Sequence, residues 1–582
     1  MGIEIRRSLY LDTRIEGPIV ELILDGCGIR RETEYNAVAF ARTKFLDYLK
    51  GLSNDIKPEH RDLIGKPAYT TLTAVGEEVG MPRDAKGSTA VGHELLSGVA
   101  YLHPMLRIAR SIKNGIMVNE EVDKLLTFIK EKSSTLHLIG MVSNNQEHSH
   151  IQHLYAILSR AFNLGVEKIR IHFISDGRGT PPHSAPRFVE DLNDWIAENL
   201  PERKIDIKIA TIIGRDIAMN RSSATWYKTE KTLRAIVEAN APRYSTIEKA
   251  IKEAYQKGLN DQYIPPSVIG DYQGFNNYDG VILWNFRKDR MEFLARMLVD
   301  PIHTLTERLR NSQDNTYKNF NEFSRVIYKK DLNFSTIKIL ALVEYYRDIP
   351  CPVAFREPVH QWSLGKMLSH FGFRQYKISG VDKAKAIALL NGSKQEDLLP
   401  REKRITIPLP ADMLEYIKGF DTYKGEEGYK EDPYIKFPQM ELVDLTNKII
   451  ELIEQAEPFT CIMANIANPD MVGHTADVVA CIKAMEIVDW SVKRITLATL
   501  KKKGIVFITA DHGNIEELIT EEGEPNTFHT RSPVPFIIVG AGDVRLRPDG
   551  TLKDVAPTIL FFALGREEPL AREKLPGQLL IY

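Results

Sequence analysis

The sequence is poor in cysteine and has no long apolar run, and each of these features argues against a class of protein. Its four cysteines, Cys27, Cys351, Cys461 and Cys481, are far apart and form no CxxC pair, which argues against a disulfide framework or a cysteine zinc site and favours a reducing compartment. No apolar segment is long enough to cross a bilayer, and the N-terminus lacks the apolar core of a signal peptide. A formal charge of −2 over 582 residues gives no reason to expect a nucleic-acid partner. We therefore expect a cytoplasmic protein with neither membrane nor nucleic acid as a partner.

What the sequence does contain is an alternation of short apolar runs and longer helical patterns, which indicates an α/β fold. Hydrophobic residues make up 43% and charged residues 26%, as in globular proteins. Strands are expected at 18–25, 136–142, 168–176, 204–214, 280–286, 459–467, 504–511 and 534–540, and long helices within 149–165 and 475–504. The segments 244–280 and 391–404 have the weakest pattern, so we expect them to be surface loops or insertions.

The segment "NPDMVGHT" places Asp470 and His474 four residues apart, where an apolar strand gives way to a helix. Side chains at this spacing lie on one face of a helix, so both can reach a single cation. By itself the pair also fits a helix-capping carboxylate beside a surface histidine. Other segments are needed to decide.

Other strand ends carry the same kinds of side chain. Asp25 ends "ILDG", Asp511 and His512 follow the strand in "ITADHGN", and His529 in "NTFHTRSPVP" precedes another strand. Sites in parallel α/β sheets form at the carboxyl ends of strands, so these ligands can meet if the two ends of the chain share one sheet. Such oxygen and nitrogen ligands fit two divalent cations, Mn²⁺ or Zn²⁺ better than Mg²⁺, and paired cations stabilise phosphoryl transfer.

Motifs along nearly the whole chain resemble those of the cofactor-independent (2,3-bisphosphoglycerate-independent) phosphoglycerate mutases of the alkaline phosphatase superfamily. In order they are "LILDGCGIR", "VGEEVGMP", "VGHE", "GMVSNNQEHSHIQHLYAIL", "DGRGTPPHSA", "IIGRDIAMNR", "WNFRKDR", "NIANPDMVGHT", "ITADHGNIE" and "FHTRSPVPFIIVG". The resemblance implies two α/β domains. An alkaline-phosphatase-like metal domain would comprise residues 1–105 and 356–582, and an inserted substrate-binding domain residues 106–355. The chain would cross between them near "GVAYLHPMLRIA" and "PCPVAFREPV".

The resemblance also implies which residues bind metal and substrate. Asp470, His474 and His529 would hold one cation, and Asp25, Asp511, His512 and the oxygen of the nucleophile the other. We expect Mn²⁺, with Zn²⁺, Co²⁺ and Mg²⁺ as alternatives. A phosphoglycerate would be contacted by His148, Asp176, Arg178, Arg215, Arg221, Arg287, Arg290 and Lys383.

Two of these assignments have a second interpretation. Arg287 and Arg290 are three residues apart at the start of an expected helix, where two guanidinium groups can share one phosphate. Such a pair is also common on a solvated helix face. Lys383 is distinguished from Lys385 only by its place in the order of motifs.

The chain departs from the family pattern at three places. The nucleophile in the family is a serine in a "GNSEVGH"-like motif, whereas this chain has "KGSTAVGHE", so Thr89 aligns with the serine, Ser88 precedes it, and Ala90 replaces the glutamate that follows. Spacing favours Thr89, and metal coordination would activate either hydroxyl. "DGRD" is here "DGRG", so Gly179 lacks a carboxylate that contacts the glycerate hydroxyls in the family. "VSNNQEHSH" replaces "SDGG" ahead of His148.

We therefore expect a monomeric isomerase that interconverts 3-phosphoglycerate and 2-phosphoglycerate through phospho-Thr89. Thr89, His148 and Lys383 would be the catalytic residues, with His148 as the acid–base group for the glycerate oxygens. Two alternatives remain. Thr89 and Gly179 are also compatible with a metal-dependent phosphatase or phosphotransferase, in which the return of the phosphoryl group is lost. The third interpretation is a catalytically silent protein that binds metal and metabolite.

Overall fold

The computed structural model describes residues 16–582 except 146, 201–204, 221–226, 300–331, 346–348, 350, 357, 359, 393–396, 422–431, 521–522 and 566–572. Its contacts divide the chain into unit 1, Met1–Leu102 with Val359–Tyr582, and unit 2, His103–Pro358. Each unit has its own hydrophobic core and its own eight-stranded sheet, which confirms the expected α/β fold. The metal-binding and substrate-binding roles expected for the two parts stay predictions.

The sheet of unit 1 is mostly parallel. Its strand order is β14 (Glu402–Ile407), β13 (Arg374–Gly380), β15 (Thr460–Ile466), β1 (Ile19–Leu24), β16 (Ile505–Thr509), β17 (Val534–Val539), β2 (Ala68–Thr73) and β18 (Gly550–Thr551). The first five strands are parallel, β17 is antiparallel to both of its neighbours, and β18 is parallel to β2. Every residue of β1 and β15 is buried, as expected for central strands covered on both faces.

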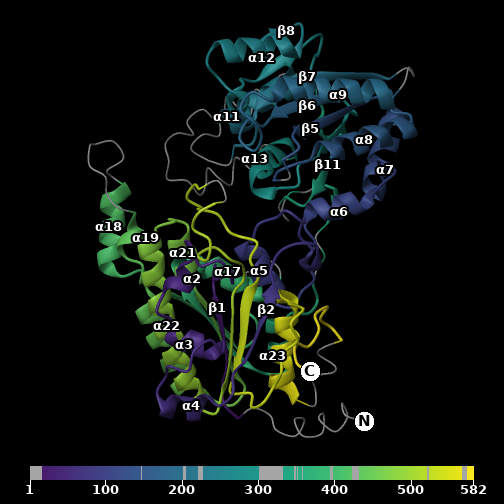
Figure 1. The fold of residues 1–582 in the computed structure, drawn as a ribbon. Coiled ribbons are helices and arrows are strands. Elements are labelled where there is room, and N and C mark those ends of the chain that lie inside the picture. The colour runs from purple at the N-terminus through teal and green to yellow at the C-terminus, as the bar shows by residue number, and fades with distance from the viewer. Residues whose placement is uncertain are drawn as a thin grey trace. The chain divides into compact units, whose positions relative to one another are not determined.

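Helices cover both faces of this sheet. Figure 1 shows α22 and α3 on one side of the strands and α23 on the other. The α-helices of unit 1 are α2 (Ala37–Phe40), α3 (Lys44–Leu49), α4 (Pro58–Ile64), α5 (Thr89–Leu96), α16 (Leu364–His370), α17 (Ala384–Ala388), α18 (Ala411–Asp421), α19 (Pro433–Lys436), α20 (Leu442–Glu454), α21 (Asn468–Gly473), α22 (Val478–Lys501) and α23 (Val555–Leu564). Unit 1 is thus assembled from both ends of the chain around one sheet.

The sheet of unit 2 is also mostly parallel. Its order is β12 (Val353–Phe355), β11 (Lys338–Val343), β10 (Gly280–Leu283), β5 (Thr135–Met141), β6 (Lys168–Ser175), β7 (Asp206–Gly214), β9 (Ser267–Ile269) and β8 (Arg243–Tyr244). Only the pairing of β7 with β9 is antiparallel within this sheet. A separate two-stranded sheet pairs β3 (Ile112–Lys113) with β4 (Ile116–Met117).

The α-helices of unit 2 are α6 (Pro104–Ser111), α7 (Glu120–Lys132), α8 (Ile151–Leu164), α9 (Ala185–Asn199), α10 (Arg215–Ala218), α11 (Tyr227–Glu238), α12 (Ile247–Gln256) and α13 (Lys288–Val299). Helices connect most neighbouring parallel strands of this unit, such as α8 between β5 and β6 and α9 between β6 and β7. Within the described ranges, none of the protein's helices combines the length and the apolar character that a bilayer-spanning segment requires. All four cysteines are free thiols.

All eight expected strands and both long helices are confirmed within a few residues. The expectation for 244–280 was wrong, because α12 and β9 lie within it. Helix α12 begins at Ile247 with Thr246 as its N-cap, whose side chain accepts a hydrogen bond from the Lys249 N–H. In the second segment expected to be a loop, residues 402–404 belong to β14, whereas 393–396 lie outside the described residues.

Candidate active site

The central strands of unit 1 bring the expected ligands together at one edge of the sheet. β1 lies between β15 and β16, with Leu24 paired to Ile466 and Ile23 to Thr509. The three strands are parallel, so the residues that follow them leave the sheet at the same edge. These residues include Asp25 after β1, Asp470 on α21 after β15, and Asp511 and His512 after β16.

Gly26 lets the Asp25 turn approach α21 closely. Its φ is +76°, a left-handed conformation that favours glycine. A Cβ at this position would lie 2.7 Å from Cα of Asp470. The glycine after Asp25 is therefore needed for the two carboxylates to converge.

Thr89 lies inside this group of side chains. It is the first residue of α5, and its Oγ1 lies 2.8 Å from Nε2 of His512 and 3.2 Å from Nζ of Lys383. The Ser88 hydroxyl forms no hydrogen bond with any residue that the structure describes. The geometry therefore favours Thr89 over Ser88 as the nucleophile.

Lys383 lies among the carboxylates of unit 1. Its Nζ is 2.9 Å from Oδ1 of Asp25 and 2.6 Å from Oδ2 of Asp470, whereas Lys385 is exposed. Burial acts to lower the pKa of Lys383, but the nearby carboxylates outweigh it and hold the pKa above its usual value. The ammonium group therefore stays charged beside Thr89, and its expected contact with substrate stays a prediction.

Three histidines of unit 1 have their tautomers fixed by the backbone. Nδ1 of His474, His529 and His512 lies 2.8, 2.9 and 3.2 Å from a carbonyl oxygen, which can only accept, so each Nδ1 carries a hydrogen and Nε2 is the ring atom that remains for other contacts. The Nε2 atoms of His474 and His529 are 3.3 Å apart, and lie 3.4 and 3.2 Å from Oδ1 of Asp470. Asp470 acts to raise the pKa of both rings, so this place favours a positive charge, which a proton or a metal ion can supply.

The remaining carboxylates also fit a cation. Burial and the neighbouring Asp511 raise the pKa of Asp25, because Lys383 does not fully offset the clustered negative charge. Oδ2 of Asp511 is buried, with Nδ1 of His93 at 3.2 Å and Nε2 of His512 at 3.5 Å. Among the described residues, two groups of side chains have ligand atoms close enough to hold an ion: Asp470, His512 and His529, and Asp25, His93 and Asp511. They differ from the expected sets in the place of His512 and in including His93, so the assignment of each ligand to an ion stays a prediction.

His93 was given no role by the sequence analysis. Its Nδ1 lies 2.9 Å from the carbonyl oxygen of Thr89 and 3.2 Å from Oδ2 of Asp511, and its Nε2 lies 3.0 Å from the Asn465 amide nitrogen. Both ring nitrogens are thereby engaged, so His93 orients Thr89 and Asp511 and is not needed as a ligand. Its position four residues after Thr89 on one helix face was the signal available in the sequence.

In unit 2, the second set of expected residues surrounds His148. β10, β5, β6 and β7 are neighbours, and the loops after them carry Arg287, His148, Asp176 and Arg215 respectively. Burial, together with the charges of Arg215, Arg287, Arg290 and Arg178, lowers the pKa of His148 to about 2. His148 is therefore neutral within a cluster of guanidinium groups that suits an anionic ligand.

Contacts within this cluster fix the side chains that lie deepest. Arg215 donates from Nη2 to Nε2 of His148 at 2.6 Å and from Nη1 to Oδ1 of Asp176. Because Nε2 accepts this bond, the ring hydrogen of His148 is on Nδ1, which is buried without a partner among the described residues. Arg287 pairs with Glu147. Arg178 is exposed, and Arg221 lies outside the described residues.

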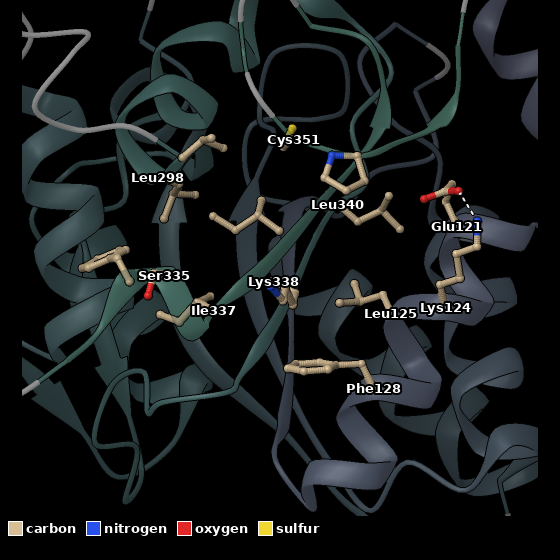
Figure 2. Close-up of a pocket in the computed structure, with 14 residues that line it drawn as sticks. Glu121, Lys124, Leu125, Phe128, Leu298, Ser335, Ile337, Lys338, Leu340 and Cys351 are labelled. Atoms are coloured by element: carbon tan, nitrogen blue, oxygen red, sulfur yellow. Dashed lines mark hydrogen bonds and ion pairs between the residues drawn. The ribbon is translucent and has the colours of Figure 1, made fainter.

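A cavity of about 510 Å³ lies elsewhere in unit 2, between α7, the end of α13 and β11 (Figure 2). Its walls include Leu125, Phe128 and Leu340, and a Glu121–Lys124 ion pair of 2.8 Å lies at one side. None of the expected site residues lines this cavity. The cavity is therefore separate from the arginine cluster.

Unit 1 places carboxylates and imidazoles around a hydroxyl, and unit 2 places guanidinium groups around a neutral imidazole. These features are those of an α/β metalloenzyme that acts on an anionic substrate. Comparisons with known proteins agree. Residues 108–326, all within unit 2, match the family model described as the BPG-independent PGAM N-terminus. The chain is 32% identical over 556 residues to the 2,3-bisphosphoglycerate-independent phosphoglycerate mutase of Moorella thermoacetica, covering 94% of this chain and 95% of that protein.

The fold comparison gives the same result. A crystal structure of Leishmania mexicana phosphoglycerate mutase at low cobalt concentration matches with a TM-score of 0.63 and 26% identity, over 98% of each chain. The chain belongs to the 2,3-bisphosphoglycerate-independent phosphoglycerate mutase family.

Proposed function

We propose that this protein is a metal-dependent phosphoglycerate mutase that interconverts 3-phosphoglycerate and 2-phosphoglycerate through phospho-Thr89. Family membership supports the reaction and favours it over a phosphatase. The observation that carries the proposal is the position of the Thr89 hydroxyl, 2.8 Å from His512 and 3.2 Å from Lys383 within the carboxylate cluster.

The metal ligands would be Asp25, Thr89, Asp470, His474, Asp511, His512 and His529. When bound, two divalent cations would lower the pKa of the Thr89 hydroxyl and offset charge on the phosphoryl oxygens. Mn²⁺ is the proposed metal, because mixed carboxylate and imidazole donors suit it better than Mg²⁺; Zn²⁺, Co²⁺ and Mg²⁺ are the alternatives. The buried Asp511 carboxylate and the convergence of the Nε2 atoms of His474 and His529 beside Asp470 support this assignment.

Thr89 would form its Oγ1–phosphorus bond as the bond between phosphorus and the first glycerate oxygen breaks, and the proton of the Thr89 hydroxyl would pass to that departing oxygen. The neighbouring glycerate hydroxyl would then attack the same phosphorus and release Thr89, which would regain a proton as the attacking hydroxyl loses one. Lys383 would offset charge at Thr89, and the first turn of α5 presents N–H groups without intrahelical partners near the phosphoryl group. The Thr89 hydroxyl thus takes part in both steps, as the nucleophile in the first and the leaving group in the second.

The residues of unit 2 would bind the substrate. Arg287 and Arg290 are proposed to hold the phosphate, and Arg178, Arg215 and Arg221 the carboxylate and hydroxyls. Asp176 would hold Arg215 in place, since the two side chains are paired. Nδ1 of His148, which has no partner among the described residues, is available to a glycerate oxygen.

The test is to supply the purified protein with Mn²⁺ and 3-phosphoglycerate and to measure 2-phosphoglycerate and inorganic phosphate together. We expect 2-phosphoglycerate with little free phosphate. Free phosphate equal to the substrate consumed, with no isomer, would instead identify a phosphatase. No turnover with any of the four metals and no phospho-enzyme by intact mass would identify a silent binding protein. Thr89→Ala should abolish turnover, whereas the neighbouring Ser88→Ala should retain it.

A further inference from the structure

Asn145 and Gly179 lie in the loops that follow the neighbouring strands β5 and β6. The Asn145 side chain occupies the space beside Gly179 that a larger residue would fill. A Cβ at Gly179 would lie 1.4 Å from Nδ2 and 2.6 Å from Cγ of Asn145. The two positions therefore exclude each other: a side chain at 179 requires the Asn145 carboxamide to leave.

A chain of hydrogen bonds holds the two loops together. The Asn145 N–H donates to Oγ of Ser143 at 3.0 Å, and Ser143 donates to Oδ2 of Asp176 at 2.8 Å. The Gly179 N–H donates to Oδ1 of the same carboxylate at 3.1 Å. The backbone on both sides of the Asn145 carboxamide is thus tied to Asp176, which in turn binds Arg215.

The carboxamide itself is left available. It is half-buried, and it forms no hydrogen bond with any residue in the described part of the chain. Arg178, adjacent to Gly179, is exposed, and its charge acts on His148. A group that both donates and accepts hydrogen bonds therefore lies in loops that also carry Arg178, which is proposed to bind substrate, and Asp176, which pairs with Arg215.

From this geometry we infer that Asn145 is a substrate-binding residue, and that Gly179 is required because it makes room for the Asn145 carboxamide. The inference rests on the proposed function and identifies a group that reads the glycerate part of the substrate. A carboxamide can accept a hydrogen bond from a hydroxyl or donate one to a carboxylate, and it adds no negative charge. A carboxylate can only accept and would repel an anionic substrate. Asn145 thus supplies at this place the polar group that Gly179 cannot.

The test is a double-mutant cycle with Asn145→Gly, Gly179→Ala and the two combined, measured as KM for 3-phosphoglycerate and as the ratio of isomer to free phosphate. Asn145→Gly should raise KM about 10-fold, the loss expected for one hydrogen bond to a charged substrate. Gly179→Ala should have the same effect, because its methyl group displaces the carboxamide. The double variant should be no worse than either single variant. The exposed neighbour Asn144→Ala is the matched control and should leave KM unchanged.

Thermal unfolding without substrate tests the packing separately. Gly179→Ala should lower Tm in the wild-type background and not in the Asn145→Gly background, because the overlap has then been removed. An unchanged KM in an active Asn145→Gly variant, or KM effects that multiply in the double variant, would overturn the inference and leave the proposed function intact. If the wild type forms no isomer, the proposed function fails first, while the Tm cycle still reports on the packing.

Discussion

The two units use histidine with opposite electrostatics. In unit 1 the hydrogen bond and charge of Asp470 raise the pKa of His474, against a smaller effect of burial. In unit 2 burial lowers the pKa of His153 to about 3, and burial together with guanidinium groups lowers that of His148 to about 2. A site with excess negative charge binds cations, and a site with excess positive charge binds anions. The comparison therefore supports the proposal that unit 1 binds metal and unit 2 binds substrate.

The largest effect should come from removing a carboxylate that faces two histidines of unit 1. Asp470→Asn should lower bound Mn²⁺ and reduce isomerisation at least about 100-fold, because stabilisation of several kcal/mol by the cation is lost. Elemental analysis after dialysis, followed by the isomerisation assay, measures both. Asp444→Asn on the exposed side of α20 is the control. If Asp470→Asn bound as much Mn²⁺ as the wild type, the proposal that Asp470 is a metal ligand would be contradicted.

A smaller effect is expected from His93, which orients Thr89 and Asp511. His93→Ala should weaken Mn²⁺ binding about 10- to 100-fold, as is typical for a group that orients a ligand. His93→Asn, which can keep a donor near the place of Nδ1, should recover part of this loss. A metal titration followed by activity measures the two variants. Equal metal affinity in His93→Ala and the wild type would contradict the positioning role.

In unit 2, removal of an arginine that is proposed to bind substrate should leave the bound Mn²⁺ unchanged. Arg178 is exposed, so Arg178→Ala should not disturb the fold. We expect KM for 3-phosphoglycerate to rise about 10-fold, because a charge-assisted hydrogen bond to the anion is lost. The readouts are steady-state kinetics, bound Mn²⁺ and Tm. Loss of bound Mn²⁺ in Arg178→Ala would contradict the proposal that metal binds in unit 1 and substrate in unit 2.

The last predicted effect is a pH dependence of the stability of unit 2. A buried chain of hydrogen bonds joins Asp279 to His137 at 3.1 Å, His137 to His172 at 3.0 Å, and His172 to Thr211 at 3.0 Å. Burial lowers the pKa of both histidines below 6.5, against the hydrogen bond that His137 donates to Asp279. As the pH falls, His137 and His172 are therefore protonated in the unfolded chain before they are protonated in the folded protein. The free energy of unfolding should fall as pH drops below about 6.5, by up to about 1.4 kcal/mol per pH unit for each histidine.

Hydrogen exchange of β5 and β6 at pH 7.5 and 5.5, corrected for the intrinsic rate, measures this dependence. Protection should decrease at the lower pH, and His172→Gln, which can keep a donor toward His137, should show a weaker decrease. Protection in the wild type that is unchanged or increased by acid would contradict the prediction.

The sequence was sufficient for the features that depend on local pattern. Buried strands such as β1 and β15 are mostly apolar, and the polar residues after the buried strands of unit 1 indicated Asp25, Asp470 and Asp511. Features that depend on distant contacts could not be read in this way. From the sequence, Lys383 was distinguished from Lys385 only by its place in the order of motifs. The physical distinction is its ion pairs with Asp25 and Asp470, which are 358 and 87 residues away. The space shared by Asn145 and Gly179 likewise arises only when β5 and β6 pair.

The central claim is that unit 1 gathers two divalent cations around Thr89. Anomalous diffraction from crystals grown with Mn²⁺ tests this most directly. The account predicts two manganese peaks, one within bonding distance of Asp470, His474 and His529, and the other of Asp25, Thr89, Asp511 and His512. Manganese bound only to other residues, or absent from these side chains, would contradict it.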